Sequence, residues 1–147
     1  MTVKKIFVGS DHAGFVAKEE IKKLLLALGY EVVDCGTNSS EVSVDYPDFA
    51  REVCQNVQKD SDFYGVLVCG SGIGMSIAAN RNKDIRCGLA TTCDHARLAR
   101  EHNNANVIAF GERLSSIEEI LKMTKLFFES DFLGGRHQRR VDKLKGE

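Results

Sequence analysis

Short apolar runs rich in β-branched residues alternate with longer amphipathic stretches along the chain, and this alternation limits the possible folds more than any other sequence feature. The run YGVLVCG at 64–70 contains no charged side chain to place on a solvent-facing side of a sheet. Such a strand is typical of a parallel sheet whose two faces are both covered. Parallel neighbours need long crossover connections, and the amphipathic stretches supply them. The alternation therefore predicts an α/β fold with helices on both sheet faces.

The pattern also places the individual elements. Strands are predicted at 5–9, 30–36, 64–70, 85–92 and 105–111. Helices are predicted at 15–29, 45–57, 76–81, 94–102 and 115–130. The first helix has one apolar face, formed by Ile21, Leu24, Leu25 and Leu28. At the start of the last helix Ser115 and Glu118 have the spacing of a capping box. Together these elements predict a Rossmann-like three-layer sandwich with a five-stranded parallel sheet.

Size and charge exclude several classes of protein. With 147 residues, 43% of them hydrophobic, the chain suits a single domain over 1–147 with one sizeable core. A formal net charge of −1 gives no overall attraction to nucleic acid or to a membrane surface. No apolar stretch is long enough to span a bilayer, and Gly-Ser-Asp-His at 9–12 interrupts the first apolar run, so no secretory signal is expected.

The cysteines indicate a reducing compartment. They are five in number and form no CxxC pair, so neither a disulfide framework nor a zinc knuckle is expected. We therefore expect a cytoplasmic protein. Cys35, Cys54, Cys87 and Cys93 are expected to be small buried apolar side chains, whereas Cys69 stands at the end of the central strand.

Polar and glycine-rich segments follow three of the predicted strands, at 10–12, 70–72 and 111–113. The carboxyl ends of parallel strands share one edge of a sheet, where α/β proteins bind their ligands. We therefore expect these three segments to meet at one site.

The loop GSGIG at 70–74 does not match the nucleotide-binding motifs. The dinucleotide fingerprint requires glycine at its sixth position, where this chain has Met75, and a P-loop requires a lysine that the loop lacks. Two interpretations remain open: a tight packing turn, or a cradle of backbone N–H groups for an anion. In the second, Cys69 lies beside the positive end of the following helix, a setting that favours a thiolate able to take a proton from carbon.

Other features are equally ambiguous from the residues alone. His95 and His102 could share a helix face, but a metal site there lacks a third ligand. The basic tail, residues 136–147, has three interpretations. It is a solvated helix face, or a nucleic-acid patch, although it has no interleaved aromatic residues, or a segment whose Arg136 and Arg140 bind one phosphate. Tyr46 either lines a sugar pocket or packs at a helix start.

Five blocks of sequence together resemble a known family. GSDHAG, DYPDFA, CGSGIGMSIAANR, REHNNANVIAFGER and GGRHQRR stand in the order and spacing of the ribose-5-phosphate isomerase B group of the RpiB/LacAB sugar-phosphate isomerases. The resemblance implies a cofactor-independent intramolecular oxidoreductase of the pentose phosphate pathway. Such an enzyme interconverts D-ribose 5-phosphate and D-ribulose 5-phosphate through an enediolate, without metal or cofactor. Two alternatives are isomerisation of a six-carbon phosphate, of allose or galactose, and a non-catalytic phosphate- or nucleotide-binding module.

The resemblance also implies roles for particular residues. Cys69 would be the base, His102 would assist ring opening with Asp11 on the sugar hydroxyls, and Ser71 would keep a hydroxyl where many relatives have threonine. The substrate-binding residues would be Asp11, His12, Gly70, Ser71, Gly72, Ile73, Gly74, Asn103, Arg113, Arg136 and Arg140. The protein would be a homodimer, or a dimer of dimers, with a shared active site to which the tail 131–147 contributes. No nucleic acid or membrane partner is expected.

Overall fold

The computed structural model describes residues 1–145, and its five strands form one all-parallel sheet in the order β2-β1-β3-β5-β4. The strands are β1 (Lys5–Ser10), β2 (Val32–Asp34), β3 (Phe63–Cys69), β4 (Cys87–Leu89) and β5 (Val107–Gly111). All residues of β3 except the first are buried, as its unbroken apolar sequence predicts. The central position of β3 explains this composition, because both of its faces are covered and both of its edges are paired.

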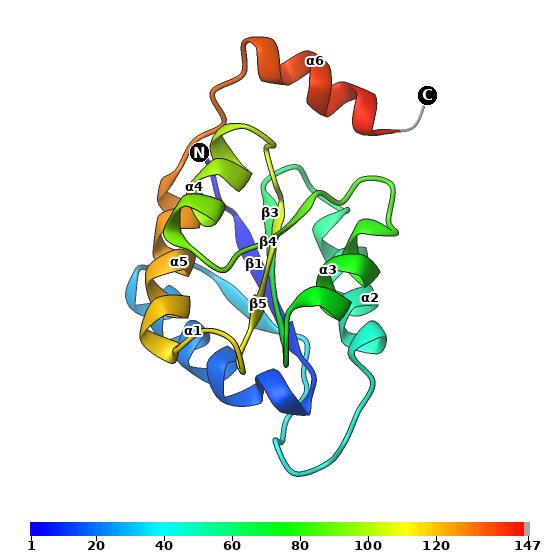
Figure 1. Ribbon diagram of the computed structural model, residues 1–147, viewed down its shortest axis with the longest axis vertical. Coiled ribbons are helices and arrows are strands. Elements are labelled where there is room, and N and C mark those ends of the chain that lie inside the picture. The colour runs from blue at the N-terminus through cyan, green and yellow to red at the C-terminus, as the bar shows by residue number, and fades with distance from the viewer. Residues whose placement is uncertain (146–147) are drawn as a thin grey trace.

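The helices cover both faces of the sheet. They are η1 (His12–Gly14), α1 (Phe15–Ala27), α2 (Tyr46–Val57), α3 (Ile73–Asn80), α4 (Cys93–Glu101), α5 (Ile117–Glu129), α6 (Arg136–Asp142) and η2 (Lys143–Lys145). Figure 1 shows α1, α4 and α5 on one face of the sheet and α2 with α3 on the other. Each face has its own apolar core, with Phe127 of α5 in one and Val53 of α2 in the other. The predicted three-layer sandwich with a five-stranded parallel sheet is therefore confirmed.

Several local predictions were wrong, including the burial of Cys87, which is half-buried. The capping box of α5 is formed by Ser116 and Glu119, one residue beyond the predicted pair, because Ser116 is the residue with extended backbone before the helix. Leu28 is exposed, because it follows the last residue of α1. Cys93 is exposed rather than buried, because it is the first residue of α4 and lies on its solvent side.

The two ends of the sheet are differently built. The strands run toward the edge where η1 and the start of α3 lie, whereas α6 lies beyond their amino ends (Figure 1). Two glycines with positive φ, Gly134 and Gly135, precede α6. None of the helices in residues 1–145 has both the length and the apolar composition that crossing a bilayer needs.

Candidate active site

The three polar segments predicted to meet at the carboxyl edge of the sheet do meet there. They enclose a pocket of about 290 Å³, whose lining residues are Asp11, Tyr46, Cys69, Gly70, Ser71, Gly74, Arg113 and Leu114. β1, β3 and β5 are neighbours in the sheet, so the residues that follow them are brought together by strand order alone. The expected convergence of 10–12, 70–72 and 111–113 is thus confirmed.

Cys69 is the last residue of β3 and is 5% exposed, at the wall of this pocket. The backbone N–H of Gly72 donates a hydrogen bond to its Sγ over 3.2 Å. Gly72 has a φ of +78°, and a Cβ there would lie 2.7 Å from Cδ1 of Leu89. Only glycine fits this left-handed and crowded turn. The turn directs an N–H group at the sulfur, which is the contact that stabilises negative charge on it.

Positive groups surround the loop after Cys69. α3 begins at Ile73, so the positive end of its dipole faces the loop, and the N–H of Ile73 donates to Oγ of Ser71 over 3.2 Å. The guanidinium of Arg113 lies over Gly70, where an added Cβ would be 2.9 Å from Nη1. This arrangement suits an anion beside the sulfur, so the cradle explains more of the geometry than a simple packing turn.

Asp11 and His12 are both fixed by backbone hydrogen bonds. Asp11 is 7% exposed, and its Oδ1 accepts from the N–H of Gly14 over 3.1 Å while the residue lines the pocket. The N–H of Val44 donates to Nδ1 of His12 over 3.1 Å. A neutral His12 that accepts at Nδ1 carries its proton on Nε2, so it can donate that proton to an anion.

Tyr46 lines the pocket and also packs at a helix start. It is the first residue of α2, and its ring lies against Gly74. A Cβ at position 74 would come within 2.6 Å of the ring carbon Cζ. The absence of a side chain at Gly74 therefore leaves the space that the Tyr46 ring occupies.

The other predicted site residues form a second cluster at the opposite end of the sheet. β4 ends at the carboxyl edge and α4 runs back from it, so His102 and Asn103 lie near the amino ends of the strands. Arg136 and Arg140 lie on α6, beyond the same end (Figure 1). Seven strand residues, the length of β3, span about 20 Å. The predicted site residues therefore fall into two separate groups within one chain.

His102 is held in this second cluster by an aromatic stack. Its ring lies parallel to that of His137 from α6, with centroids 4.2 Å apart and an interplanar angle of 14°. Loss of hydration and the nearby positive charge of His102, Arg136 and Arg140 lower the pKa of His137 below its usual value. A neutral His137 is the form that stacks on His102 without charge repulsion.

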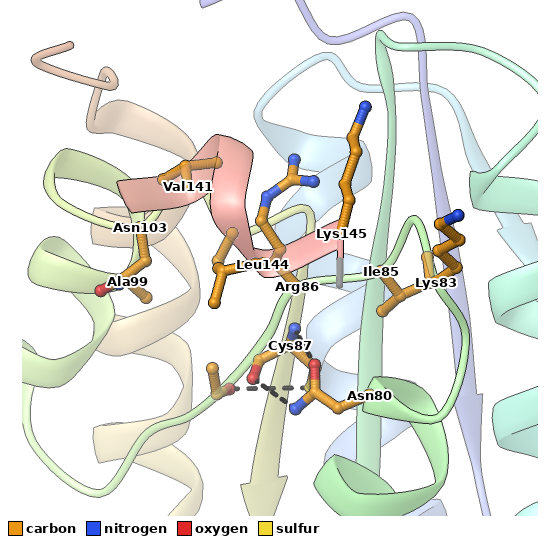
Figure 2. A pocket seen from close by; sticks show the side chains of 12 residues that line it. Asn80, Lys83, Ile85, Arg86, Cys87, Ala99, Asn103, Val141, Leu144 and Lys145 are labelled. Carbon is orange, nitrogen blue, oxygen red and sulfur yellow. Dashed lines mark hydrogen bonds between the residues drawn. The ribbon is translucent and has the colours of Figure 1, made fainter. Parts of the chain in front are cut away.

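A pocket of about 390 Å³ opens beside the second cluster. Val141 and Leu144 of the C-terminal segment line it together with Asn103 and Ala99 (Figure 2). Leu144 is 61% exposed, so this pocket has an apolar rim that residues 1–145 leave uncovered.

The described residues offer no metal site. Within residues 1–145, no group of three or more His, Cys, Asp or Glu side chains is close enough to hold an ion. The chemistry that the carboxyl-edge pocket can perform rests on a thiol, backbone N–H groups, a carboxylate and a guanidinium.

Two residues of this edge had no role predicted from sequence. Leu114 lines the pocket, and the side chain of Glu112 accepts a hydrogen bond from α1. The role of Glu112 could have been suspected from α1, because Gly14 precedes this helix and has no side chain to cap it.

Comparison with known proteins shows the family of the chain. A family model described as Ribose/Galactose Isomerase matches residues 6–144. Ribose-5-phosphate isomerase B of Escherichia coli is 42% identical over 142 residues, covering 97% of this chain and 95% of the relative. The structure of ribose 5-phosphate isomerase B from Anaplasma phagocytophilum superposes with a TM-score of 0.93 at 47% identity and covers 98% of each chain. The structure of ribose-5-phosphate isomerase B from Mycoplasma genitalium with bound ribulose-5-phosphate superposes with a TM-score of 0.94 at 40% identity and covers 99% of this chain and 96% of the other. The chain therefore belongs to the Ribose/Galactose Isomerase family.

Proposed function

We propose that this chain is an aldose–ketose isomerase that interconverts D-ribose 5-phosphate and D-ribulose 5-phosphate through an enediolate, without metal or cofactor. The observation that carries the proposal is the pocket in which Cys69 lies beside the amide loop 70–74 and Arg113. The relatives named ribose-5-phosphate isomerase B, one of them with bound ribulose-5-phosphate, support the choice of a five-carbon substrate. We assign the reaction to the pentose phosphate pathway. The free cysteines of the chain favour the reducing cytoplasm as its location.

The proton transfer follows from the geometry at Cys69. In the reaction from aldose to ketose, the thiolate takes the proton from C2. The electron pair of that bond moves to form the enediolate, whose negative charge lies on the C1 oxygen. Backbone N–H groups of the loop 70–74 that line the pocket hold this oxygen, while the N–H of Gly72 stays on the sulfur and the hydroxyl of Ser71 lies in the same loop. The proton of the C2 hydroxyl group moves to the C1 oxygen, and the thiol returns its proton to C1 as the carbonyl forms at C2, so no proton or electron is gained or lost.

The remaining residues bind and prepare the sugar phosphate. We assign ring opening to His102 as the acid, with Asp11 on the sugar hydroxyls. His12, Arg113, Arg136 and Arg140 hold the phosphate, and Asn103 holds the sugar chain. Arginine forks match phosphate oxygens in shape and charge.

The proposed roles require two copies of the chain, because the base and the ring-opening acid lie at opposite ends of one sheet. We propose a homodimer, alone or as a dimer of dimers, in which the carboxyl edge of one copy faces the His102 end of the other. Ile73 and Ile77 of α3 and Leu114 are exposed apolar residues next to the Cys69 pocket. They complement the exposed Leu144 at the rim of the second pocket. The chain is then one domain whose tail, 131–147, completes the partner's site; residues 146–147 lie outside the described part.

A mixture of two inactive variants tests this shared site. Cys69→Ala and His102→Ala each remove one half of the catalytic pair and are expected to be inactive alone. In a hybrid dimer, one site carries both substitutions and the other carries neither. Random reassortment should therefore restore about a quarter of the wild-type rate, since half of the dimers are hybrids with one intact site.

The complementation is measured after co-refolding equal amounts of the two variants. Each variant refolded alone, and a mixture of Cys69→Ala with Cys69→Ala/His102→Ala, serve as controls without an intact site. If the mixed sample is no more active than the average of its components, the shared site is wrong.

The substrate is tested by comparing five- and six-carbon aldose phosphates side by side. We expect kcat/KM for D-ribose 5-phosphate to exceed that for D-allose 6-phosphate by about tenfold or more. The six-carbon substrate must fit one more carbon between Cys69 and the side chains that bind the phosphate. Ketose formation is followed by NMR in metal-free buffer. The reverse ranking would favour a six-carbon substrate, and phosphate binding without any ketose would favour the non-catalytic module.

A further inference from the structure

Glu112 caps a helix from which it is far away in sequence. Its Oε1 accepts a hydrogen bond from the N–H of Ala17 over 2.6 Å, across 95 positions of the chain. Ala17 is the third residue of α1, and the preceding Gly14 offers no capping side chain. The first N–H groups of a helix need an acceptor, and a carboxylate there is also favoured by the helix dipole. Glu112 supplies this acceptor from the loop after β5.

The backbone around Glu112 is bonded to the catalytic loop at the same time. The N–H of Glu112 donates to the carbonyl of Cys69, and the N–H of Arg113 donates to the carbonyl of Gly70, both over 3.0 Å. Gly111 lies so close to the loop that a Cβ there would be 2.5 Å from the backbone of Ser71. The loop 111–113 is thus fixed to the Cys69 loop through its backbone and to α1 through the Glu112 side chain.

We propose that Glu112 is a positioning residue that holds the guanidinium of Arg113 over Gly70 and keeps the Asp11–His12 turn in register with Cys69. The turn η1 leads directly into α1, so an anchor at the start of α1 also fixes η1. Glu112 is not among the residues that line the pocket, so it acts through its neighbours rather than on substrate. This inference rests on the proposed function, which places Arg113 on the phosphate.

The carboxyl group allows a discriminating pair of substitutions. Glu112→Ala removes the acceptor for Ala17, whereas Glu112→Gln removes the charge and keeps an oxygen in the same place. We expect Glu112→Ala to raise the KM for D-ribose 5-phosphate about tenfold with a smaller change in kcat, because phosphate contacts bind ground state and transition state alike. Glu112→Gln should keep KM within about threefold of wild type, because its side-chain oxygen still accepts the hydrogen bond.

The matched control is Glu118→Ala, which removes the same carboxyl group from the first turn of α5. The Glu118 side chain is 80% exposed and pairs only with Lys122 among the described ion pairs, so KM and kcat should not change. Thermal unfolding of all variants at equal concentration separates positioning from a loss of folded protein. Equal KM values for wild type and Glu112→Ala, or an equal rise of KM in both Glu112 variants, would overturn the proposal.

Amide hydrogen exchange tests the anchor without catalysis. We expect the Ala17 amide to exchange at least about tenfold faster in Glu112→Ala than in wild type and Glu112→Gln, because it loses its acceptor. Unchanged exchange of this amide in Glu112→Ala contradicts the proposal, whatever the activity. A wild-type protein that makes no ketose from D-ribose 5-phosphate but shows the expected exchange refutes the proposed function and leaves the anchor standing.

Discussion

Replacing Cys69 with alanine is expected to lower kcat for D-ribose 5-phosphate about a thousandfold, because a positioned acid–base group contributes about 10²–10⁴ to rate. Alanine fills nearly the same space at the end of β3 but has no group that can take a proton from C2. The groups proposed to hold the phosphate are side chains other than Cys69, among them Arg113 over Gly70 and the arginines of α6, which the substitution leaves in place. Binding of inorganic phosphate should therefore stay within about threefold of the wild-type affinity, because phosphate contacts do not involve the sulfur.

Turnover is measured by NMR or by a coupled assay for ketose, and phosphate affinity by isothermal titration. Cys93→Ala is the matched control, because Cys93 is an exposed thiol at the start of α4 and has no place in the pocket. It should retain the full rate. A Cys69→Ala protein that turns over as fast as Cys93→Ala would remove the thiol from the mechanism. A variant that also fails to bind phosphate would instead mean that Cys69 is needed to shape the loop.

The carboxyl-edge half of the candidate site could be predicted because it depends only on strand order and chain direction. Asp11 and Arg113 each follow a strand and Cys69 ends one, and parallel strands bring such residues to one edge whatever the side chains between them. The buried central strand was equally predictable, since a strand covered on both faces has no need of alternating polarity.

The errors arose where several local arrangements satisfy the same sequence pattern. The segment SSIEE contains two overlapping capping-box registers, and the extended backbone of Ser116 selects the second. The position of His102 was inferable in part, because a helix that crosses back between parallel strands must end at their amino side. The stack of His102 on His137 was not, because α6 follows two glycines whose positive φ values no pattern of neighbours determines.

The second large effect is expected from Asp34→Ala, which would leave a buried lysine short of its main partner. Lys18 is 1% exposed, and its Nζ donates to both carboxylate oxygens of Asp34 over 2.8 Å. Removing one partner of a buried ion pair costs about 3–5 kcal/mol, because the remaining charge stays buried. We expect about 3 kcal/mol of unfolding free energy to be lost, the lower end of that range. Glu19 still accepts from Lys18 over 2.9 Å, which limits the loss.

The loss should depend on pH in a defined direction. Burial alone would raise the pKa of Asp34, but hydrogen bonds from Lys18, Lys22 and Gly36 outweigh it and hold the pKa below its usual value. A carboxyl group whose pKa is lowered by folding stabilises the folded state above its unfolded pKa of about 3.9. This stabilisation disappears as the pH falls further, so wild type and Asp34→Ala should converge in stability in acid.

Urea unfolding at one fixed protein concentration measures the difference, with Glu20→Ala as the control. Glu20 pairs with Lys23 on the exposed side of α1, the helix that also carries Lys18, and the Lys23 side chain is 74% exposed. Breaking that pair should cost less than about 0.5 kcal/mol, as for other surface ion pairs. The double variant Asp34→Ala/Lys18→Met should recover most of the lost stability, because an apolar side chain needs no partner in the same buried space. If Asp34→Ala is no less stable than Glu20→Ala, or if the double variant is no more stable than the single one, the charge of Lys18 is not what makes Asp34 necessary.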